Sequence, residues 1–445
     1  MDWLTSSATE QGRAILAGLV SPVDLADGYL DAITRHPDAA RIFARTTPDR
    51  ARNEAVAAHD RAKAGLRRGL LDGVALSWKD NIDSAGVATQ GGTRLLEGRV
   101  PVADARQLAD ATLQGLVCLG KTHMTELAFS GLGVNPGTAT PPNSLDPALC
   151  PGGSSSGAAV SVALGLAAAA VGSDTGGSVR LPAAWNNLVG FKPTHGAVPM
   201  EGVLPLCQSF DVTGPIARTV EDCAEIMAVL TGRTAADLRG ASIKGLRLLV
   251  LGGVPYEDAR EGPVQAFEEA VAHLAAAGAS ITHATPPEAA RAMALGTPLY
   301  AAEAYGLWRA QIDVAPDLML PVTLARFRSG EQMTAPEFVE RWTDLRRARV
   351  TWAQAVAGFD AVLLPTAPLL PPQADRAIAD PEFFATENML SLRNTRIANV
   401  LGLPAVSLPT GRPACGLMLM GRAGADRALL RVAAAVEQAL AATAT

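Results

Sequence analysis

Two short stretches rich in glycine and serine stand out in the chain. Residues 152–157 read Gly-Gly-Ser-Ser-Ser-Gly, and residues 172–182 read Gly-Ser-Asp-Thr-Gly-Gly-Ser-Val-Arg-Leu-Pro. The apolar segment between them, residues 157–172, predicts a buried helix. Tight turns that gather backbone N–H groups are what a site needs to stabilise a developing oxyanion. Because the same residues also form ordinary tight turns, the two stretches alone leave both interpretations open.

Two familiar motifs in this region do not fit their usual structural context. Residues 115–122 match the phosphate-binding pattern GxxxxGK[ST], but Leu-Val-Cys-Leu between the glycines favours a buried strand. Residues 153–157 match GxSxG, in which Ser155 would follow a central strand. The four prolines of residues 141–151 exclude that strand. We therefore reject a nucleotide site and an α/β-hydrolase site.

Short apolar runs between glycines predict strands, and helical patterns separate several of them. The expected strands are at residues 74–78, 117–119, 168–171, 246–251, 361–364, 405–408 and 417–420. Helices are expected to begin after Ser21 and after Thr47, the latter reaching about residue 70, and another is expected from Thr219 to a stop at Gly232. This alternation predicts an α/β fold with a mixed central β-sheet flanked by helices.

The domain organisation is expected to be simple in spite of the length of 445 residues. No linker rich in glycine, serine or charge interrupts the chain, and strand-like segments continue beyond the proline-rich residues 365–372. We therefore expect one large domain over residues 1–445. Residues 1–70 would form an N-terminal helical arm, residues 71–235 the core with the two glycine–serine stretches, and residues 236–445 the rest of the sheet and the substrate pocket.

Composition excludes several classes of protein. Hydrophobic residues make up 48% and charged residues 18% of the chain, as is typical of a globular protein. A formal net charge of −6 without a basic run predicts no nucleic-acid partner. The chain shows no membrane-spanning run and no signal-peptide pattern. Five cysteines without CxxC and six histidines without HExxH predict a cytoplasmic protein with no disulfide frame and no metal site.

Lysine is rare in this chain. Five of the 38 basic side chains are lysines, at positions 63, 79, 121, 192 and 244, and the other 33 are arginines. Lysine can lose its proton inside a protein, whereas arginine effectively cannot. The few lysines are therefore the positions at which a basic residue with a proton-transfer role would be sought.

Taken together, these segments resemble the amidase signature family. That family carries GGSSxG, then G-[ST]-D-x-G-G-S-[IV]-R-x-P, then [FL]-K-P-[TS], and the chain has all three at residues 152–157, 172–182 and 191–194. The two key serines of the family stand 24 residues apart, as Ser154 and Ser178 do. The KDNI, GKTxMxE and NxxGxP segments of the family match residues 79–82, 120–126 and 399–404. The similarity extends over about residues 21–440.

The resemblance implies a hydrolase that cleaves a small linear amide through a serine acyl-enzyme, without a cofactor or a metal. It implies Ser178 as the nucleophile, Ser154 as the bridging serine and Lys79 as the general base, with a cis peptide bond between Gly153 and Ser154. For Lys79 the alternative of an ordinary ion pair with a neighbouring aspartate stays open. Both interpretations keep the residue at the end of the strand predicted over residues 74–78.

The same resemblance implies roles for the loop around the nucleophile. The backbone N–H groups of Thr175, Gly176, Gly177 and Ser178 would form the oxyanion hole. The supporting residues of the loop would be Asp174 and Arg180, and we expect Ser155, Ser156 and Ser173 to be turn or supporting hydroxyls.

The chemistry of a general base agrees with lysine at position 79. Neutralising a lysine at pH 7 costs roughly 4.6 kcal/mol, whereas neutralising an arginine costs about 7.5–9 kcal/mol. Burial lowers the pKa of lysine by up to about 3–5 units. This shift can offset the free energy needed to neutralise a lysine at pH 7, but not most of the free energy needed to neutralise an arginine. Leu76 and Trp78, which flank the residue, fit a desolvated position.

Several functions stay open beside the stand-alone amidase. They are the glutaminase subunit of a tRNA-dependent amidotransferase, a hydrolase of urea-like amides, and a non-catalytic relative. The amidotransferase subunit has an acidic residue seven positions before the asparagine that corresponds to Asn399, and Leu392 stands there in this chain. Arg393 and Arg396 could contact a substrate carboxylate, but we favour ordinary surface arginines. The expected partner is a small-molecule amide, with a homodimer as one option.

Overall fold

Eleven strands build the sheet at the centre of the computed structural model, which describes residues 3–442. They are β1 (Phe43–Thr46), β2 (Ala75–Lys79), β3 (Val117–Thr122), β4 (Ala169–Asp174), β5 (Val189–Lys192), β6 (Val212–Ala217), β7 (Arg247–Leu251), β8 (Ser280–Ala284), β9 (Ala361–Pro365), β10 (Ala405–Pro409) and β11 (Gly416–Met420). Their order across the sheet is β1-β3-β2-β4-β6-β5-β10-β11-β9-β7-β8. Parallel and antiparallel pairs both occur, so the predicted mixed sheet is confirmed.

Both faces of the sheet are covered by apolar packing. In β7, Leu248 and Val250 belong to the hydrophobic core on one face, whereas Leu249 and Leu251 belong to the core on the other. The residues of β9 divide in the same way. Because successive side chains of a strand point to opposite faces, a strand that is apolar throughout requires helices on both sides of the sheet.

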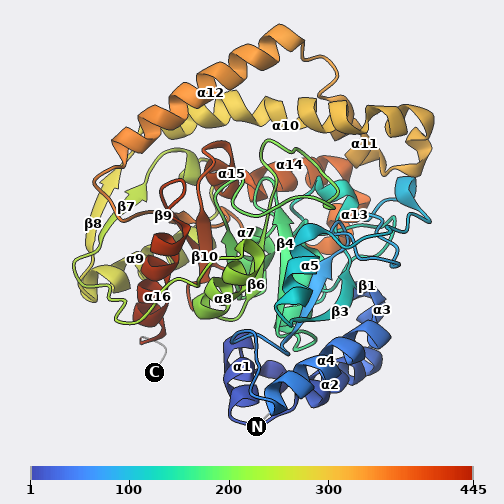
Figure 1. The fold of residues 1–445 in the computed structure, drawn as a ribbon. Helices are drawn as coiled ribbons and strands as arrows, with labels where there is room; N and C mark the ends of the chain where they lie inside the picture. Colours follow the sequence, from blue (N-terminus) through green and yellow to red (C-terminus); the bar gives the residue numbers. More distant parts are fainter. Residues whose placement is uncertain (1–2, 443–445) are drawn as a thin grey trace.

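The helices form layers around this sheet. They are α1 (Ala8–Leu16), α2 (Pro22–Arg35), α3 (Ala39–Ile42), α4 (Pro48–Lys63), α5 (Arg106–Leu113), α6 (Ser156–Ala163), α7 (Arg180–Trp185), α8 (Val220–Thr231), α9 (Glu261–Ala276), α10 (Pro287–Val314), α11 (Pro321–Arg328), α12 (Ala335–Ala355), α13 (Ala374–Ala379), α14 (Pro381–Ser391), α15 (Arg393–Val400) and α16 (Asp426–Ala441). Helices α1, α2 and α4 lie at one end of the molecule, and the long helices α10 and α12 lie side by side across the other end (Figure 1).

Local signals set several of the helix boundaries. Helix α2 begins at Pro22, and its N-cap Ser21 accepts a hydrogen bond from the N–H of Val23 at 3.1 Å. Helix α8 follows the N-cap Thr219 and ends at Thr231, and its C-cap Gly232 has a φ of 62°. Both boundaries agree with the sequence, because side-chain oxygens satisfy the first N–H groups of a helix and glycine tolerates a left-handed φ at its end.

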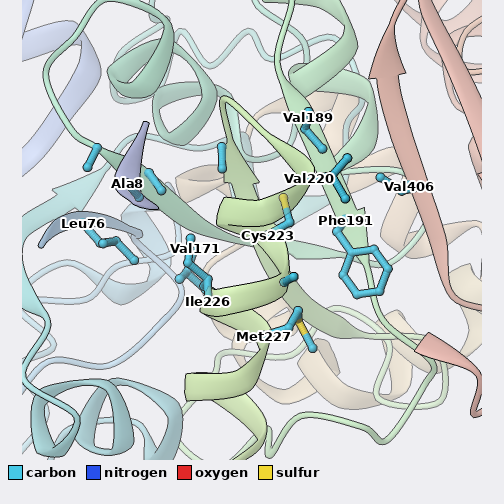
Figure 2. Close-up of a cluster of buried hydrophobic side chains, with 14 of the residues drawn as sticks. Ala8, Leu76, Val171, Val189, Phe191, Val220, Cys223, Ile226, Met227 and Val406 are labelled. Carbon is cyan, nitrogen blue, oxygen red and sulfur yellow. The ribbon is translucent and has the colours of Figure 1, made fainter. Parts of the chain in front are cut away.

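Helix α8 shows how the predicted apolar stripe is used. Figure 2 shows Val220, Cys223 and Met227 of this helix pointing into a cluster with Val171 of β4 and Phe191 of β5. All five side chains are buried. The helical period of the apolar residues therefore places one face of α8 against the centre of the sheet.

The segment between the two glycine–serine stretches differs from the single buried helix that we expected. Helix α6 ends at Ala163, Gly165 has a φ of 70°, and β4 begins at Ala169. The segment is apolar almost throughout, and such a run fits a buried helix or a buried strand equally well. Residues 117–122, by contrast, form the buried strand β3, as expected of the rejected phosphate-binding motif.

The N-terminal part contains one strand besides its helices. Strand β1 pairs antiparallel with β3 and forms an edge of the sheet. The division of the domain at residues 70 and 235 stays a prediction. Among residues 3–442, no helix combines the length and the apolar character that crossing a membrane requires.

Two parallel neighbours at the centre of the sheet position the candidate site. Strands β2 and β4 pair in the register Leu76↔Ala169, Ser77↔Ala170 and Trp78↔Val171. The carboxyl ends of parallel neighbours meet at the same edge of a sheet, where ligands bind in open α/β sheets. Lys79 is the last residue of β2 and Asp174 the last of β4, so the sheet itself brings these two residues to one place.

Candidate active site

Lys79 lies at the end of β2 and is completely buried. Its Nζ atom is 2.6 Å from Oγ of Ser154 and 2.8 Å from Oγ of Ser173. The carbonyl oxygen of Ser173 is 3.3 Å away. The Ser173 hydroxyl is also held by the side chain of Asn81, whose Nδ2 donates to it at 3.0 Å. The first contact of the expected relay, between the lysine and Ser154, is thus present.

The surroundings of Lys79 favour its uncharged form. Burial lowers the pKa of Lys79 to about 7, although the nearby carboxylates of Asp174 and Asp211 act in the opposite direction. No carboxylate forms an ion pair with this ammonium group among residues 3–442, so the alternative ion pair with a neighbouring aspartate is absent from that part of the chain. A lysine in this setting is partly uncharged at neutral pH and can accept a proton.

The Gly-Gly-Ser-Ser-Ser-Gly stretch forms the turn that leads into α6. The peptide bond between Gly153 and Ser154 is cis. The N–H of Gly153 donates to the carbonyl of Gly131 at 2.7 Å, and the carbonyl of Ser154 accepts from the N–H of Thr125 at 3.2 Å. Backbone hydrogen bonds on both sides of Ser154 therefore hold its hydroxyl toward Lys79.

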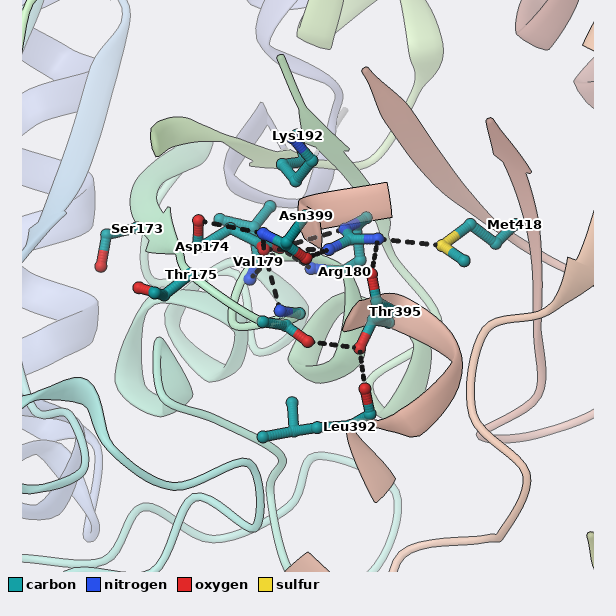
Figure 3. A network of polar contacts seen from close by, with 12 residues as sticks. Ser173, Asp174, Thr175, Val179, Arg180, Lys192, Leu392, Thr395, Asn399 and Met418 are labelled. Atoms are coloured by element: carbon teal, nitrogen blue, oxygen red, sulfur yellow. Dashed lines mark hydrogen bonds and ion pairs between the residues drawn. The ribbon is translucent and has the colours of Figure 1, made fainter. Parts of the chain in front are cut away.

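Asp174 organises the second loop, which follows β4 (Figure 3). Its Oδ1 accepts from the N–H of Gly177 at 2.8 Å and its Oδ2 from the N–H of Val179 at 3.1 Å. Arg180 donates to both carboxylate oxygens, through Nη2 at 2.9 Å and Nε at 3.1 Å. Asn399 Nδ2 adds a hydrogen bond of 2.8 Å to Oδ1. Asp174 and Arg180 are both fully buried, so they brace the loop from within.

Electrostatics keep this carboxylate charged. Burial on its own raises the pKa of Asp174, but the charge and hydrogen bonds of Arg180 outweigh it, and the pKa is about 2. Arg180 is tied in turn to the C-terminal half of the chain, because its Nη1 donates to the carbonyl of Thr395 at 2.8 Å and its Nη2 to Oδ1 of Asn399 at 2.6 Å. The loop and helix α15 are thus held as one unit.

The N–H groups of this loop divide into used and available donors. The N–H of Gly177 is taken by Asp174. The N–H groups of Thr175, Gly176 and Ser178 have no hydrogen-bond partner anywhere in residues 3–442. Of the four N–H groups expected to form the oxyanion hole, that of Gly177 is therefore occupied by Asp174, and the other three remain available to a ligand.

Position 177 requires glycine because of the conformation of the turn, not because of its N–H group. It has a φ of 137°, and a Cβ atom at this position would lie 2.0 Å from Oγ1 of Thr395. That hydroxyl donates to the carbonyl of Gly176 at 2.7 Å. Only glycine lets the loop pass this close to helix α15.

Ser178 faces a cavity of about 520 Å³. Thr175 and Gly176 form the same wall, and residues of α10, α11, α12, α14 and α15 line much of the remainder. The carbonyl of Ser178 accepts from the N–H of Ser155 at 3.2 Å, which joins the two loops. No hydrogen bond links the hydroxyls of Ser154 and Ser178, both of which the structure describes. The structure thus places Ser178 on the neighbouring loop without showing the second contact of the relay.

Residues that the sequence did not mark complete the site. Asp211 precedes β6, and its Oδ1 accepts a hydrogen bond of 2.5 Å from the Thr175 hydroxyl. Phe129, Tyr300 and Arg326 line the cavity from segments without a recognisable motif. Among residues 3–442, no group of three or more histidine, cysteine or acidic side chains could hold a metal ion.

The fold and this pairing of a buried lysine with serine-bearing loops define an amide hydrolase. A family model described as Amidase matches residues 24–430. The chain therefore belongs to the amidase signature family and is an enzyme of its class, a hydrolase of C–N bonds. The family resemblance read from the sequence is confirmed.

Known relatives span nearly the whole chain. It is 35% identical to a 2-amino-5-chloromuconic acid deaminase of Comamonas testosteroni, over 87% of this chain and 86% of that protein. It is 30% identical to the A-type subunit of the glutamyl-tRNA(Gln) amidotransferase of Symbiobacterium thermophilum, over 97% and 96% of the two chains. The crystal structure of the peptide amidase of Stenotrophomonas maltophilia matches with a TM-score of 0.82 and 28% identity, over 97% of this chain and 96% of that one.

The pH profile of amide hydrolysis should follow the protonation of Lys79. Lysine acts as a base only when its amine is uncharged, so with a pKa of about 7 we expect kcat/KM to rise with pH and to level off above that value. Below the midpoint, kcat/KM should fall about tenfold per pH unit. The measurement is initial rates of product release between pH 5 and 9 on a neutral amide.

Lys192 provides the control for this pH profile. Burial lowers its pKa to about 7 as well, but its Nζ donates to the carbonyl of Pro193 at 2.7 Å. Lys192→Met should therefore keep the midpoint. A midpoint that moved with Lys192, or a rate independent of pH, would contradict the assignment of Lys79.

The buried pair of Asp174 and Arg180 should be a large contributor to stability. Arg180→Met leaves the carboxylate of Asp174 buried without its cation, and we expect a loss of about 3–5 kcal/mol in the free energy of unfolding. Chemical denaturation followed by circular dichroism measures it. The exposed pair of Arg13 and Glu221 is the control, and Arg13→Gln should cost less than about 1 kcal/mol. Equal effects of the two substitutions would refute the bracing role.

Proposed function

We propose that this enzyme hydrolyses a small linear carboxylic amide to the acid and ammonia or an amine through a serine acyl-enzyme. The observation that carries the proposal is the buried Lys79, 2.6 Å from the Ser154 hydroxyl and next to the loop of Ser178. An amide is a poor electrophile, so its hydrolysis requires an activated nucleophile and a donor for the leaving nitrogen. One lysine with a pKa near neutrality serves both needs.

Acylation begins with proton transfer along the two serines. Lys79 Nζ accepts the proton of the Ser154 hydroxyl. The Ser154 oxygen in turn accepts the proton of the Ser178 hydroxyl. The oxygen of Ser178 attacks the carbonyl carbon and forms a tetrahedral intermediate. The C–N bond then breaks, the nitrogen receives the proton that returns through the same relay, and the acyl group remains on Ser178 as an ester.

Deacylation repeats these steps with water in place of the serine. Lys79 accepts a proton from water through Ser154, and the resulting hydroxide attacks the ester carbonyl. The C–O bond to Ser178 breaks, the Ser178 oxygen regains a proton, and the acid leaves. In each half of the cycle Lys79 gives back the proton that it took, to the leaving nitrogen in acylation and to Ser178 in deacylation, so no cofactor is needed.

The oxyanion is stabilised by backbone donors. The N–H groups of Thr175, Gly176 and Ser178 lack protein partners in residues 3–442 and belong to the wall of the cavity. Asp174 fixes the loop from behind, so the donors need little rearrangement when charge develops. Positioned donors of this kind are worth about 2.7–4 kcal/mol each in other enzymes.

The surroundings of the site support a small-molecule substrate. The cavity of about 520 Å³ suits a ligand of metabolite size. The five cysteines, Cys118, Cys150, Cys207, Cys223 and Cys415, are unpaired and buried, which supports a reducing cytoplasm as the place of the reaction.

A second candidate function is that of a glutaminase component in an amidotransferase. The 30% identity to the A-type subunit of a glutamyl-tRNA(Gln) amidotransferase favours it. The apolar Leu392 disfavours it, because this residue lines the cavity where the resemblance places an acidic residue in that relative. Glutaminase activity that appears only with a co-purifying partner would favour the amidotransferase component, whereas hydrolysis by the isolated chain favours the amidase.

Substituting the proposed nucleophile tests the acyl-enzyme. Ser178→Ala should lower amide hydrolysis by roughly a thousandfold or more and abolish labelling by a fluorophosphonate, while the circular dichroism spectrum is unchanged. The hydrolysis screen covers aliphatic, aryl and urea-like amides. The exposed Ser242 is the control, and Ser242→Ala should keep both activities. Labelling that persists in Ser178→Ala would show that another residue is the nucleophile.

Replacing the proposed base by arginine tests the need for deprotonation. Lys79→Arg keeps the positive charge but costs about 7.5–9 kcal/mol to neutralise, so its kcat/KM should fall to within about tenfold of that of Lys79→Ala. The measurement is ammonia release at saturating and limiting substrate. Lys63→Arg, at an exposed position of α4, should behave like the wild type. Activity retained in Lys79→Arg would exclude a general base at this position.

A further inference from the structure

Two guanidinium groups in the wall of the cavity have no hydrogen-bond or ion-pair partner among residues 3–442. Arg396, on α15, is 7% exposed, and its side chain makes no hydrogen bond or ion pair within residues 3–442. Arg326, on α11, has its Nη1 atom buried without a hydrogen-bond partner. Both residues line the cavity into which Ser178 opens. A buried cation without a counter-charge is costly, so this arrangement points to a ligand that supplies one.

Two other arginines that pack inside the protein are paired with carboxylates. Arg180 binds the carboxylate of Asp174, and Arg50 binds those of Glu54 and Asp104. Arg396 and Arg326 instead contact aromatic rings: Cζ of Arg396 lies 6.0 Å from the ring centre of Tyr300, and Cζ of Arg326 lies 4.4 Å from that of Phe129. Ring contacts orient a guanidinium group but leave its N–H groups available.

The two cations are close enough to affect each other. Burial lowers the pKa of Arg326 to about 9, and the charge of Arg396 acts in the same direction. Burial also lowers the pKa of Arg396. An anion bound between them would relieve both the repulsion and the loss of hydration.

The remaining charges of the cavity are already engaged. Glu337 is its single carboxylate within the described residues, and its Oε2 accepts hydrogen bonds of 2.9 Å from the N–H and the hydroxyl of Thr334 at the start of α12. Arg341 Nη1 donates to the carbonyl of Ala294 at 3.4 Å. Glu337 is also exposed, whereas Arg396 is buried, so the inner part of the cavity carries net positive charge.

We propose that Arg396 and Arg326 bind a carboxylate of the substrate, so that the enzyme acts on monoamides of short dicarboxylic acids. This inference rests on the serine amidase mechanism proposed above. Tyr300 lines the same cavity and supplies a third donor, because its buried hydroxyl has no hydrogen-bond partner within the described part of the chain. Guanidinium groups bind carboxylates through two parallel hydrogen bonds, which gives the recognition its direction.

The position of Arg396 sets the length of the acyl chain. Its Nε lies 3.8 Å from the point that a Cβ on Gly176 would occupy, and the N–H of Gly176 is one of the oxyanion donors. A carboxylate held by Arg396 is therefore only a few bonds from the carbonyl that Ser178 attacks. The monoamides of succinic, glutaric and adipic acid cover this range.

Matched pairs of substrates test the proposal. Each acid monoamide is compared with the neutral amide of equal chain length: succinamate with butanamide, glutaramate with pentanamide, and adipamate with hexanamide. The wild type should hydrolyse at least one of the anionic amides with a kcat/KM roughly 10- to 100-fold above its neutral match. Equal rates within all three pairs, or faster hydrolysis of the neutral amides, would overturn the proposal.

Variants at the two arginines show whether the preference arises there. Arg396→Gln and Arg326→Gln should each lose roughly 10- to 100-fold in kcat/KM on the anionic amide but less than about threefold on the neutral one. Arg396→Lys should lose less activity on the anionic amide than Arg396→Gln, because lysine keeps the positive charge although it lacks the paired N–H donors of a guanidinium group. Arg328→Gln, at an exposed position of α11, is the matched control and should change neither rate. An equal loss on both substrates would assign Arg396 to the chemical step and overturn carboxylate recognition.

A binding measurement separates this inference from the proposed function. Calorimetric titration of Ser178→Ala with succinate, glutarate and adipate needs no catalysis, and we expect binding that weakens roughly tenfold or more in Ser178→Ala/Arg396→Gln. A wild type that resists the fluorophosphonate yet binds a diacid through Arg396 would overturn the amidase mechanism alone. A wild type that is labelled and hydrolyses neutral amides, with no diacid binding, would overturn carboxylate recognition alone.

Discussion

The carboxylate of Asp174 is the group on which the rest of the site depends. It accepts hydrogen bonds from two N–H groups of its own loop, from Arg180 and from Asn399, which lies 225 residues later in the chain. A buried carboxylate needs this many donors because the protein interior solvates charge poorly. By meeting that need, the fold fixes the curve of the loop and joins it to helix α15. The N–H groups that Asp174 does not use are the ones left at the cavity.

The same carboxylate takes part in setting the pKa of Lys79, but geometry distinguishes Lys79 from Lys192, the other buried lysine with a pKa of about 7. Burial lowers the pKa of Lys79 and that of Lys192 to about 7 in both cases. Nζ of Lys192 donates a hydrogen bond to the carbonyl of Pro193, whereas Nζ of Lys79 lies 2.6 Å from the Ser154 hydroxyl oxygen. A lowered pKa therefore marks a buried lysine, and only a proton donor within reach makes it a base.

Much of the fold could be predicted because apolar runs and helix caps act locally. Seven strands lie where the runs predicted them, but β1, β5, β6 and β8 were missed. Strands β1 and β8 are edges, and an edge strand need not be apolar. Strand β6 contains Gly214 and Pro215, which argue against a central strand, yet it lies between β4 and β5. Pairing with neighbours distant in sequence overrides local preference there.

Some residues of the candidate site could be predicted from local motifs, whereas others are placed only by tertiary packing. Lys79, Ser154 and Ser178 were named through the resemblance to the amidase signature family, whose motifs are short continuous segments that can be recognised in the sequence. Arg396 was interpreted as a surface arginine, and the structure contradicts this, since the residue is 7% exposed and faces Tyr300 of α10, a segment with no motif. Whether an arginine is solvated or desolvated depends on what folds over it, which no local pattern records. The chemistry of the serine loops is thus encoded locally, while the choice of substrate is encoded in the packing of helices around the cavity.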